Sequence, residues 1–222
     1  MGERPRGGPG RPARAAAGRP GLAARAAAGA GAVRAGLGAR RADSWPALEV
    51  TADGAPLRFR GFIDRIDLDP VARRAVVLDY KTGRGEEYED IGEDPVLAGQ
   101  HLQLALYSRA VRANLGEDYA VGGAYWCITG RGGFKHHRLP ADRASVDARL
   151  DGALDLIGRG IRSGVFPQVP GEADRVTTFK NCRRCDFDRV CPAGRDDHWR
   201  EKQGAPGYQL FLQLAEPARA TP

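Results

Sequence analysis

The chain has 222 residues, enough for one globular domain of ordinary size with additional segments. Residues 1–44 carry nine arginines against two acidic residues, whereas residues 45–222 carry 25 basic and 26 acidic residues, so the net charge of +6 belongs to the N-terminal segment. Nucleic-acid binding by the remainder must therefore come from local placement of charge. The sequence shows no bilayer-spanning apolar run and no secretory signal, so we expect a cytoplasmic protein without a membrane partner.

Residues 1–44 consist almost wholly of Gly, Ala, Arg and Pro. Such a segment buries too little apolar surface to offset the entropy of ordering, so we predict a disordered tail. A basic arm for nucleic acid is the alternative. We expect a core over residues 45–180, a Cys-rich segment over 181–203 and a C-terminal tail over 204–222.

A β-hairpin is predicted at the start of this core, with strands at 48–51 and 57–67 around the turn Asp53-Gly54. Alternation along the second strand predicts Phe62, Asp64 and Ile66 on one face. A buried strand follows at 76–81.

Two helices are predicted farther along the chain. The first covers residues 96–114, where Pro95 is well placed to start a helix. The second covers 142–163, where apolar residues recur every three or four positions. Strands at 119–129 and 134–139 lie between the two. The order β-β-β-α-β-β-α predicts a mixed α/β fold with a central sheet flanked by helices and a small Cys-rich extension.

The buried strand ends in Asp79-Tyr80-Lys81, and alternation places Asp79 and Lys81 on one face with Tyr80 pointing away. If the strands pair in register, Asp64 supplies a second carboxylate beside Asp79. Two carboxylates with substrate phosphate and water suit Mg²⁺, and a bound metal lowers the pKa of its water for phosphodiester hydrolysis. The alternative is a plain ion pair at a solvated strand end. Four residues apart on the first helix, Gln103 and Tyr107 share a face; as an alternative, Tyr107 is a core aromatic and Gln103 a surface residue.

Three stretches in order resemble motifs of the RecB/AddB-type nuclease family, in the PD-(D/E)xK superfamily: Gly61-Phe62-Ile63-Asp64-Arg65-Ile66-Asp67, Leu78-Asp79-Tyr80-Lys81-Thr82-Gly83 and Gln103-Leu104-Ala105-Leu106-Tyr107. The resemblance implies a restriction-endonuclease-like fold. It also implies a Mg²⁺- or Mn²⁺-dependent exonuclease that acts on DNA ends or single strands in recombination and repair, together with a helicase.

Residue by residue, the resemblance implies that Asp64, Asp79 and the backbone carbonyl of Tyr80 are metal ligands. Lys81 would orient the attacking water and stabilise the transition state. Gln103 and Tyr107 would project toward the site or the DNA backbone.

Cys182, Cys185 and Cys191 follow the spacing C-x2-C-x5-C, which suits a soft metal centre. Their segment resembles the iron–sulfur segment of AddB-like members, which implies a four-iron four-sulfur cluster completed by a distant upstream cysteine. Zinc with His198 as the fourth ligand is the alternative. Cys127 lies mid-strand and is predicted to be a small buried residue.

The chain departs from the family pattern in its N-terminal segment. The family has an upstream helix with a metal-binding histidine, and no histidine precedes His101 here; the upstream cysteine is also absent. We therefore hypothesise an N-terminally shortened nuclease with weak or no activity. The alternative function is a non-catalytic DNA-binding or scaffolding module that keeps the fold and the cluster.

Overall fold

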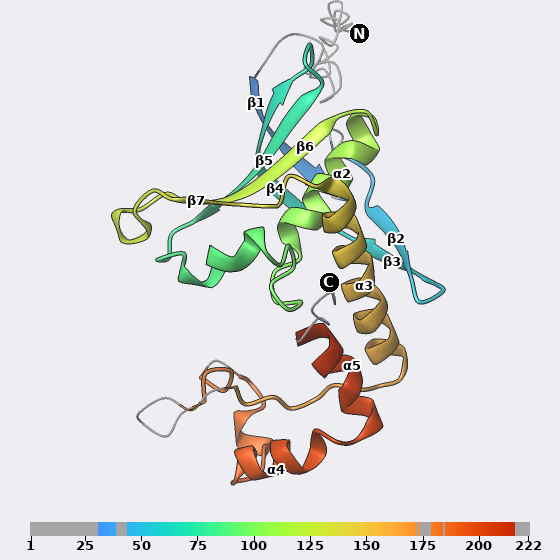
Figure 1. The fold of residues 1–222 in the computed structure, drawn as a ribbon, viewed down its shortest axis with the longest axis vertical. Helices are drawn as coiled ribbons and strands as arrows, with labels where there is room; N and C mark the ends of the chain where they lie inside the picture. Colours follow the sequence, from blue (N-terminus) through green and yellow to red (C-terminus); the bar gives the residue numbers. More distant parts are fainter. Residues whose placement is uncertain (1–30, 39–43, 172, 174–178, 184, 216–222) are drawn as a thin grey trace, which may run out of the picture.

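The computed structural model describes residues 31–38, 44–171, 173, 179–183 and 185–215. A five-stranded sheet in the order β1-β4-β5-β6-β7 forms its centre (Figure 1). The pair β5–β6 is parallel, and the other three pairs are antiparallel. The sheet strands are β1 (Gly31–Leu37), β4 (Gly61–Asp69), β5 (Arg74–Lys81), β6 (Ala120–Cys127) and β7 (His136–Arg138).

The strand β1 corrects the prediction that residues 1–44 form a disordered tail. Its backbone pairs with β4 along the edge of the sheet, and Ala35 and Leu37 are buried in the core. Composition alone misses this strand, because ladder hydrogen bonds to β4 add to the small apolar area that the segment buries. Residues 1–30 and 39–43 lie outside the described residues.

The predicted hairpin is confirmed in β2 (Leu48–Ala52) and β3 (Ala55–Phe59), which form a separate two-stranded sheet. Its turn residues Asp53 and Gly54 both have positive φ, as a two-residue hairpin turn requires. The second predicted strand is broken at Arg60, however, and β4 leaves this hairpin to join the central sheet.

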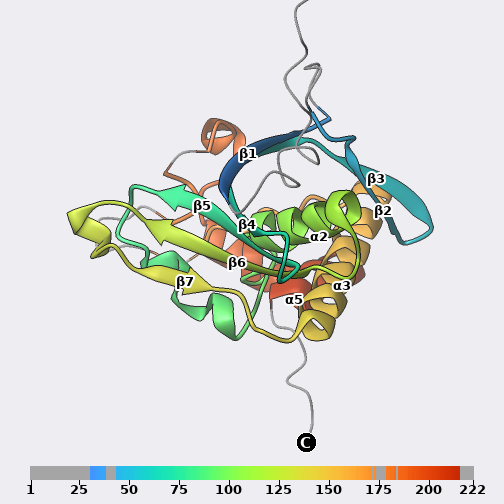
Figure 2. The same ribbon diagram turned by 90° about the horizontal axis from the view of Figure 1, so that it is seen from above.

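Two helices pack with the strands, α2 (Gln103–Leu115) and α3 (Arg143–Arg162), and both views show them lying next to each other (Figures 1 and 2). The prediction for α3 is confirmed, and the carboxylate of Asp142 caps its first turn. The prediction that a helix begins at residue 96 is wrong, because Leu97, Ala98 and Gly99 all have positive φ, which ends any right-handed helix there.

The buried core lies between the sheet and these two helices. Its largest fully buried side chains include Ile63, Val77, Leu104, Tyr125 and Leu150. The prediction of a mixed α/β fold with a central sheet and flanking helices is confirmed. No helix in the described ranges is long and apolar enough to cross a membrane.

The C-terminal part holds α4 (Arg195–Lys202) and α5 (Pro206–Ala215), together with the short 3-10 helix η3 (Asp188–Val190). The helix α5 lies within the segment expected as a C-terminal tail, and it packs on α3 (Figure 1). Two further 3-10 helices, η1 (Glu86–Gly92) and η2 (Gly130–Gly132), follow β5 and β6.

Candidate active site

Asp79 and Lys81 lie two residues apart on the face of β5 that turns toward α2. Asp79 is buried, and its Oδ2 atom lies 2.6 Å from Nζ of Lys81. The ammonium group is not well aligned with this oxygen for a hydrogen bond, so the contact is mainly an ion pair. A buried carboxylate attracts a cation strongly because little water screens its charge.

The ammonium group of Lys81 is held from several sides. Its Nζ donates to Oε1 of Gln103 at 3.2 Å, and it lies 4.8 Å from the ring centre of Tyr125 and 5.5 Å from that of Tyr88. Ring faces attract a cation by their quadrupole, most strongly where water is excluded. The lysine is therefore fixed next to Asp79.

Burial raises the pKa of Asp79, and the carboxylate of Asp64 adds to the rise, whereas Lys81 and His101 oppose it. Burial also raises the pKa of Tyr107, and the charges of Asp79 and Asp64 act in the same direction. These mutual effects show that the side chains share one electrostatic environment.

Asp64 lies at a β-bulge in β4. In the β1–β4 pairing Val33 faces Ile66 and Ala35 faces Ile63, so β4 carries one extra residue at this point. Ile63 and Ile66 are therefore both buried, and the prediction that Phe62, Asp64 and Ile66 share one face is wrong.

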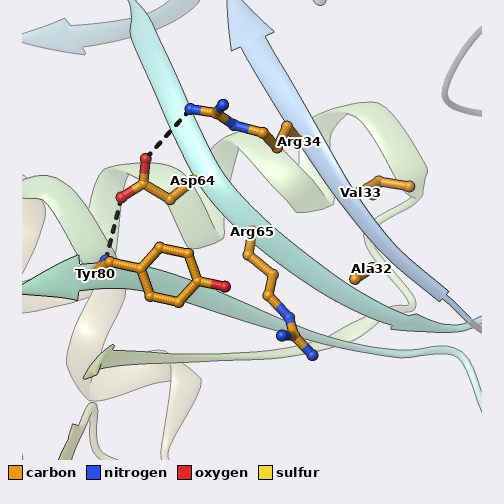
Figure 3. Close-up of a pocket in the computed structure, with 6 residues that line it drawn as sticks. All are labelled: Ala32, Val33, Arg34, Asp64, Arg65 and Tyr80. Carbon is orange, nitrogen blue, oxygen red and sulfur yellow. Dashed lines mark hydrogen bonds and ion pairs between the residues drawn. The ribbon is translucent and has the colours of Figure 1, made fainter. Parts of the chain in front are cut away.

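The bulge directs the Asp64 carboxylate toward β5 (Figure 3). Its Oδ2 accepts a hydrogen bond from the backbone N–H of Tyr80 at 3.1 Å, and its Oδ1 lies 3.7 Å from a guanidinium nitrogen of Arg34 on β1. The three residues border a groove of about 400 Å³, which also has Arg65 on its wall. Asp64 is thus accessible from the groove.

Gln103 and Tyr107 occupy the first and second turns of α2 and lie on the same face of the helix. A Cβ atom at Gly61 would lie 3.2 Å from the hydroxyl oxygen of Tyr107, so the tyrosine tip reaches the start of β4. The structure therefore brings Asp64, Asp79, Lys81, Gln103 and Tyr107 to one region of the molecule.

His101 lies just before α2, and its ring stands 5.0 Å from that of Tyr88 in an edge arrangement and 6.0 Å from that of Tyr125. Burial lowers its pKa, and the charge of Lys81 acts in the same direction. Sequence reasoning did not place His101 at the site, yet it belongs to the aromatic wall around Lys81.

The three clustered cysteines lie apart from this site, in the segment that leads to α4. Cys182, Cys185 and Cys191 are free thiols, and Cys127 is buried as predicted. Among the residues that the structure describes, no three His, Cys, Asp or Glu side chains are grouped so that they could hold a metal ion. This holds for the cysteines with His198 as well as for the carboxylates at β4 and β5.

Besides His101, sequence reasoning missed three contributors to the site: Arg34, Tyr88 and Tyr125. Arg34 belongs to a segment whose composition indicated disorder, so no local signal identified it. Tyr125 could have been found, because it faces the same side of the sheet as Asp79 once β5 and β6 are placed in parallel register.

Comparisons with known proteins bear on this arrangement. No curated protein matches the chain. Among solved structures, the crystal structure of SSO0001 aligns at 17% sequence identity with a TM-score of 0.29, over 66% of this chain and 57% of that chain, so the present chain spans less than two thirds of its length. The family model described as the PD-(D/E)XK nuclease superfamily matches residues 9–192, which include the side chains from Asp64 to Tyr107 described above. The chain belongs to the PD-(D/E)XK nuclease superfamily.

Proposed function

We propose that this chain is a Mg²⁺- or Mn²⁺-dependent deoxyribonuclease of RecB/AddB type, which hydrolyses phosphodiester bonds from DNA ends or along single strands. A role in recombination and repair beside a helicase, in the cytoplasm, belongs to the same proposal. Its support is the sequence motifs together with membership of a nuclease superfamily.

One observation carries the proposal: buried Asp79 pairs with Lys81, whose ammonium group donates to Gln103, and the charge of Asp64 acts on the carboxyl group of Asp79 by raising its pKa. An ammonium group fixed at this place can stabilise the negative charge that develops on a phosphate during hydrolysis. It can also hydrogen-bond an attacking water. Because Lys81 is held by Asp79, Gln103 and two rings, it needs little reorganisation to do either.

The carboxylates of Asp64 and Asp79 fit a divalent metal ion in their chemistry. Both offer hard oxygen donors, and Oδ2 of Asp79 is buried without a directed donor in the described part of the chain. Mg²⁺ takes one or two carboxylates and fills its remaining positions with water and substrate phosphate. Asp64, Asp79 and the backbone carbonyl of Tyr80 would hold it. When bound, such an ion supplies charge neutralisation and an acidic water.

The arrangement also favours a second candidate function, a non-catalytic DNA-binding module. Asp64 already faces Arg34 and Asp79 already pairs with Lys81, so both carboxylates have cationic partners from the chain itself. If these pairs persist with DNA bound, the protein binds without cutting.

The four-iron four-sulfur cluster stays a prediction that rests on the resemblance of the cysteine segment to that of AddB-like members. In the described residues the three thiols do not form a metal-holding group, and no step of the reaction depends on them here. Iron and acid-labile sulfide analysis of protein purified without oxygen tests the cluster, and stoichiometric zinc instead would support the zinc alternative.

Cleavage of end-labelled linear DNA with Mn²⁺ tests the proposed function. We expect Lys81→Ala to lower the cleavage rate by about a hundredfold or more, because it removes the fixed cation. Lys202→Ala, on the exposed helix α4, is the matched control and should cut like the wild type. Absence of cleavage by the wild type, with DNA binding retained, would support the non-catalytic module.

A further inference from the structure

The face of the sheet that carries Tyr80 bears a row of three aromatic rings on neighbouring strands. Tyr80 of β5 pairs with Trp126 of β6, and Trp126 pairs with His136 of β7, so all three project from the same face. The ring centres lie 5.6 Å apart for Tyr80 and Trp126 and 4.9 Å apart for Trp126 and His136. We call these three residues the aromatic row.

Arginines surround the aromatic row. The guanidinium of Arg65 lies 6.0 Å from the centre of the Trp126 ring, and a guanidinium nitrogen of Arg138 lies 3.5 Å from Nδ1 of His136. Arg34 stands at the opposite end, beside Asp64. Two acidic residues lie among these arginines: Asp64 beside Arg34, and Asp67, which accepts two hydrogen bonds from Arg65.

This face is open to solvent along part of β6 and β7. His136 and Arg138 are exposed, and Tyr80 and Trp126 are partly exposed. A Cβ atom added at Gly122, which lies on the same face of β6, would meet no atom within 4 Å. Aromatic rings that the described residues leave partly exposed, among arginines, present apolar surface that a partner can cover.

The groove beside Asp64 continues the row toward the candidate active site. Figure 3 shows the hydroxyl group of Tyr80 pointing toward the Arg65 side chain and the guanidinium of Arg34 next to the Asp64 carboxylate; all four residues line the groove. Its volume of about 400 Å³ lies within the range of ligand pockets, about 300–1,000 Å³. The backbone N–H of Tyr80 also bonds Asp64, so one residue joins the row to the site.

We propose that the aromatic row is a stacking platform for single-stranded nucleic acid, with unpaired bases on Tyr80, Trp126 and His136 and phosphates on Arg34 and Arg138. The chemistry of the surface favours this occupant over a protein. Aromatic rings stack with any base, and arginines attract a polyanion. Bases inside a duplex already stack on one another, so the row selects single strands.

The proposal rests on the proposed nuclease function and names the form of its substrate. A strand stacked on the row would run along the groove and present a phosphate near Asp64. The row thus positions the strand and takes no part in bond cleavage. Burial and the charge of Arg138 lower the pKa of His136, which is consistent with a neutral ring suited to stacking.

Fluorescence anisotropy with a labelled oligothymidylate of about 16 nucleotides tests the platform, with EDTA present so that nothing is cut. We expect Trp126→Leu to weaken binding about tenfold or more, since one base–ring stack accounts for about a five- to 150-fold change in affinity. Trp126→Phe keeps a ring and should stay within about threefold of the wild type. Phe166→Leu, at an exposed aromatic outside the row, is the matched control.

Two exposed positions on β7 give a second test that does not depend on the packing of Trp126. We expect His136→Ala to weaken binding several-fold. Arg138→Gln should reduce the slope of log affinity against log salt by about 0.7, the value for one phosphate contact on a single strand. An abasic strand and a duplex of equal length should both bind the wild type more weakly than oligothymidylate does.

Equal binding by the wild type, Trp126→Leu and His136→Ala would overturn the platform, as would equal affinity for the abasic strand. No oligothymidylate binding by the wild type would also overturn it and would point to another occupant of this face, such as a segment of the chain itself. These outcomes are independent of cleavage. Lys81→Ala can fail to alter cleavage while the binding differences stand, or the reverse.

Discussion

The two faces of β5 differ sharply although their residues alternate along one short segment. On the inner face, buried Asp79 and partly buried Lys81 form an ion pair next to Gln103 and aromatic rings. On the outer face, Tyr80 lies between them in sequence and joins an open row with Trp126. Interactions between charges are stronger away from water, so the inner face suits a reaction in which charge develops. The outer face suits contact with a large polar partner.

The largest effect of a substitution is expected at Asp64, whose carboxylate accepts the backbone N–H of Tyr80 and adds to the rise in the pKa of Asp79. We predict that Asp64→Asn lowers the cleavage rate by about a hundredfold, because an amide is a much weaker ligand and carries no charge. The amide oxygen still accepts the N–H of Tyr80, so the fold should persist. Initial rates on labelled single-stranded DNA with Mn²⁺ measure this.

Asp67→Asn is the matched control for Asp64→Asn. Asp67 lies on the same strand but bonds Arg65 on the outer face. We expect this variant to cut like the wild type when substrate is saturating, because Arg65 then gains freedom to meet phosphate and the inner face is unchanged. Equal losses of cleavage in both variants would contradict a specific role of Asp64, because the loss would then follow from removing either carboxylate of β4.

A second prediction concerns Gly85, which precedes η1 and sets the path that brings Tyr88 to Lys81. Its φ is +89°, and an added Cβ would lie 2.5 Å from Sγ of Cys127 and 2.9 Å from Nε2 of His137. We expect Gly85→Ala to lower the free energy of unfolding by about 2–4 kcal/mol, from backbone strain and overpacking.

Chemical denaturation measures the effect of Gly85→Ala, with Gly83→Ala as the control. A Cβ at Gly83 meets no atom within 4 Å, so that variant should unfold like the wild type. If the two alanine variants are equally stable, the close packing of Gly85 against Cys127 and His137 is wrong.

The smallest effect is predicted for the stability of Asp79→Asn. Burial raises the pKa of Asp79 above its ordinary value of 3.8, so the folded state binds the proton more tightly than the unfolded state. This tighter proton binding stabilises the folded state fully at a pH below the ordinary pKa of 3.8. The stabilisation is lost as the pH rises through the raised pKa of the folded state. At neutral pH the ionised carboxylate therefore costs stability, and Asp79→Asn should unfold at a higher temperature.

Thermal unfolding in EDTA between acidic and neutral pH measures this difference. The gain of Asp79→Asn should shrink as the pH falls toward 3.8. A variant less stable than the wild type at neutral pH would show that the ion pair with Lys81 outweighs the burial of Asp79.

The sequence predicted most of the strands after β1, and the second helix, because their signals are local. The turn Asp53-Gly54, the apolar run before Asp79 and the four-residue spacing in α3 depend on nearby residues alone. The placement of Asp79 and Lys81 on one face follows from alternation, which holds in β5. These features needed no knowledge of distant contacts.

The features that the sequence did not reveal all depend on partners far along the chain. The strand β1 exists through its pairing with β4, and the bulge at Asp64 appears only when these two strands are aligned. The prediction from alternation was therefore wrong in β4, because the extra residue changes the face of the strand from which Asp64 projects. The wall of Tyr88 and Tyr125 around Lys81 likewise forms only after β5 and β6 pair in parallel.

The most direct test of the division between the faces is the single-turnover cleavage rate of oligothymidylate with Mn²⁺, measured at saturating protein for Lys81→Ala and Trp126→Leu in parallel. If the two faces of β5 have separate roles, the cleavage rate of Lys81→Ala should stay about a hundredfold or more below that of the wild type at saturation. Trp126→Leu should reach the wild-type rate once enough protein is present, because it weakens binding alone. These separate roles are contradicted if Trp126→Leu stays slow at saturation while Lys81→Ala cuts like the wild type.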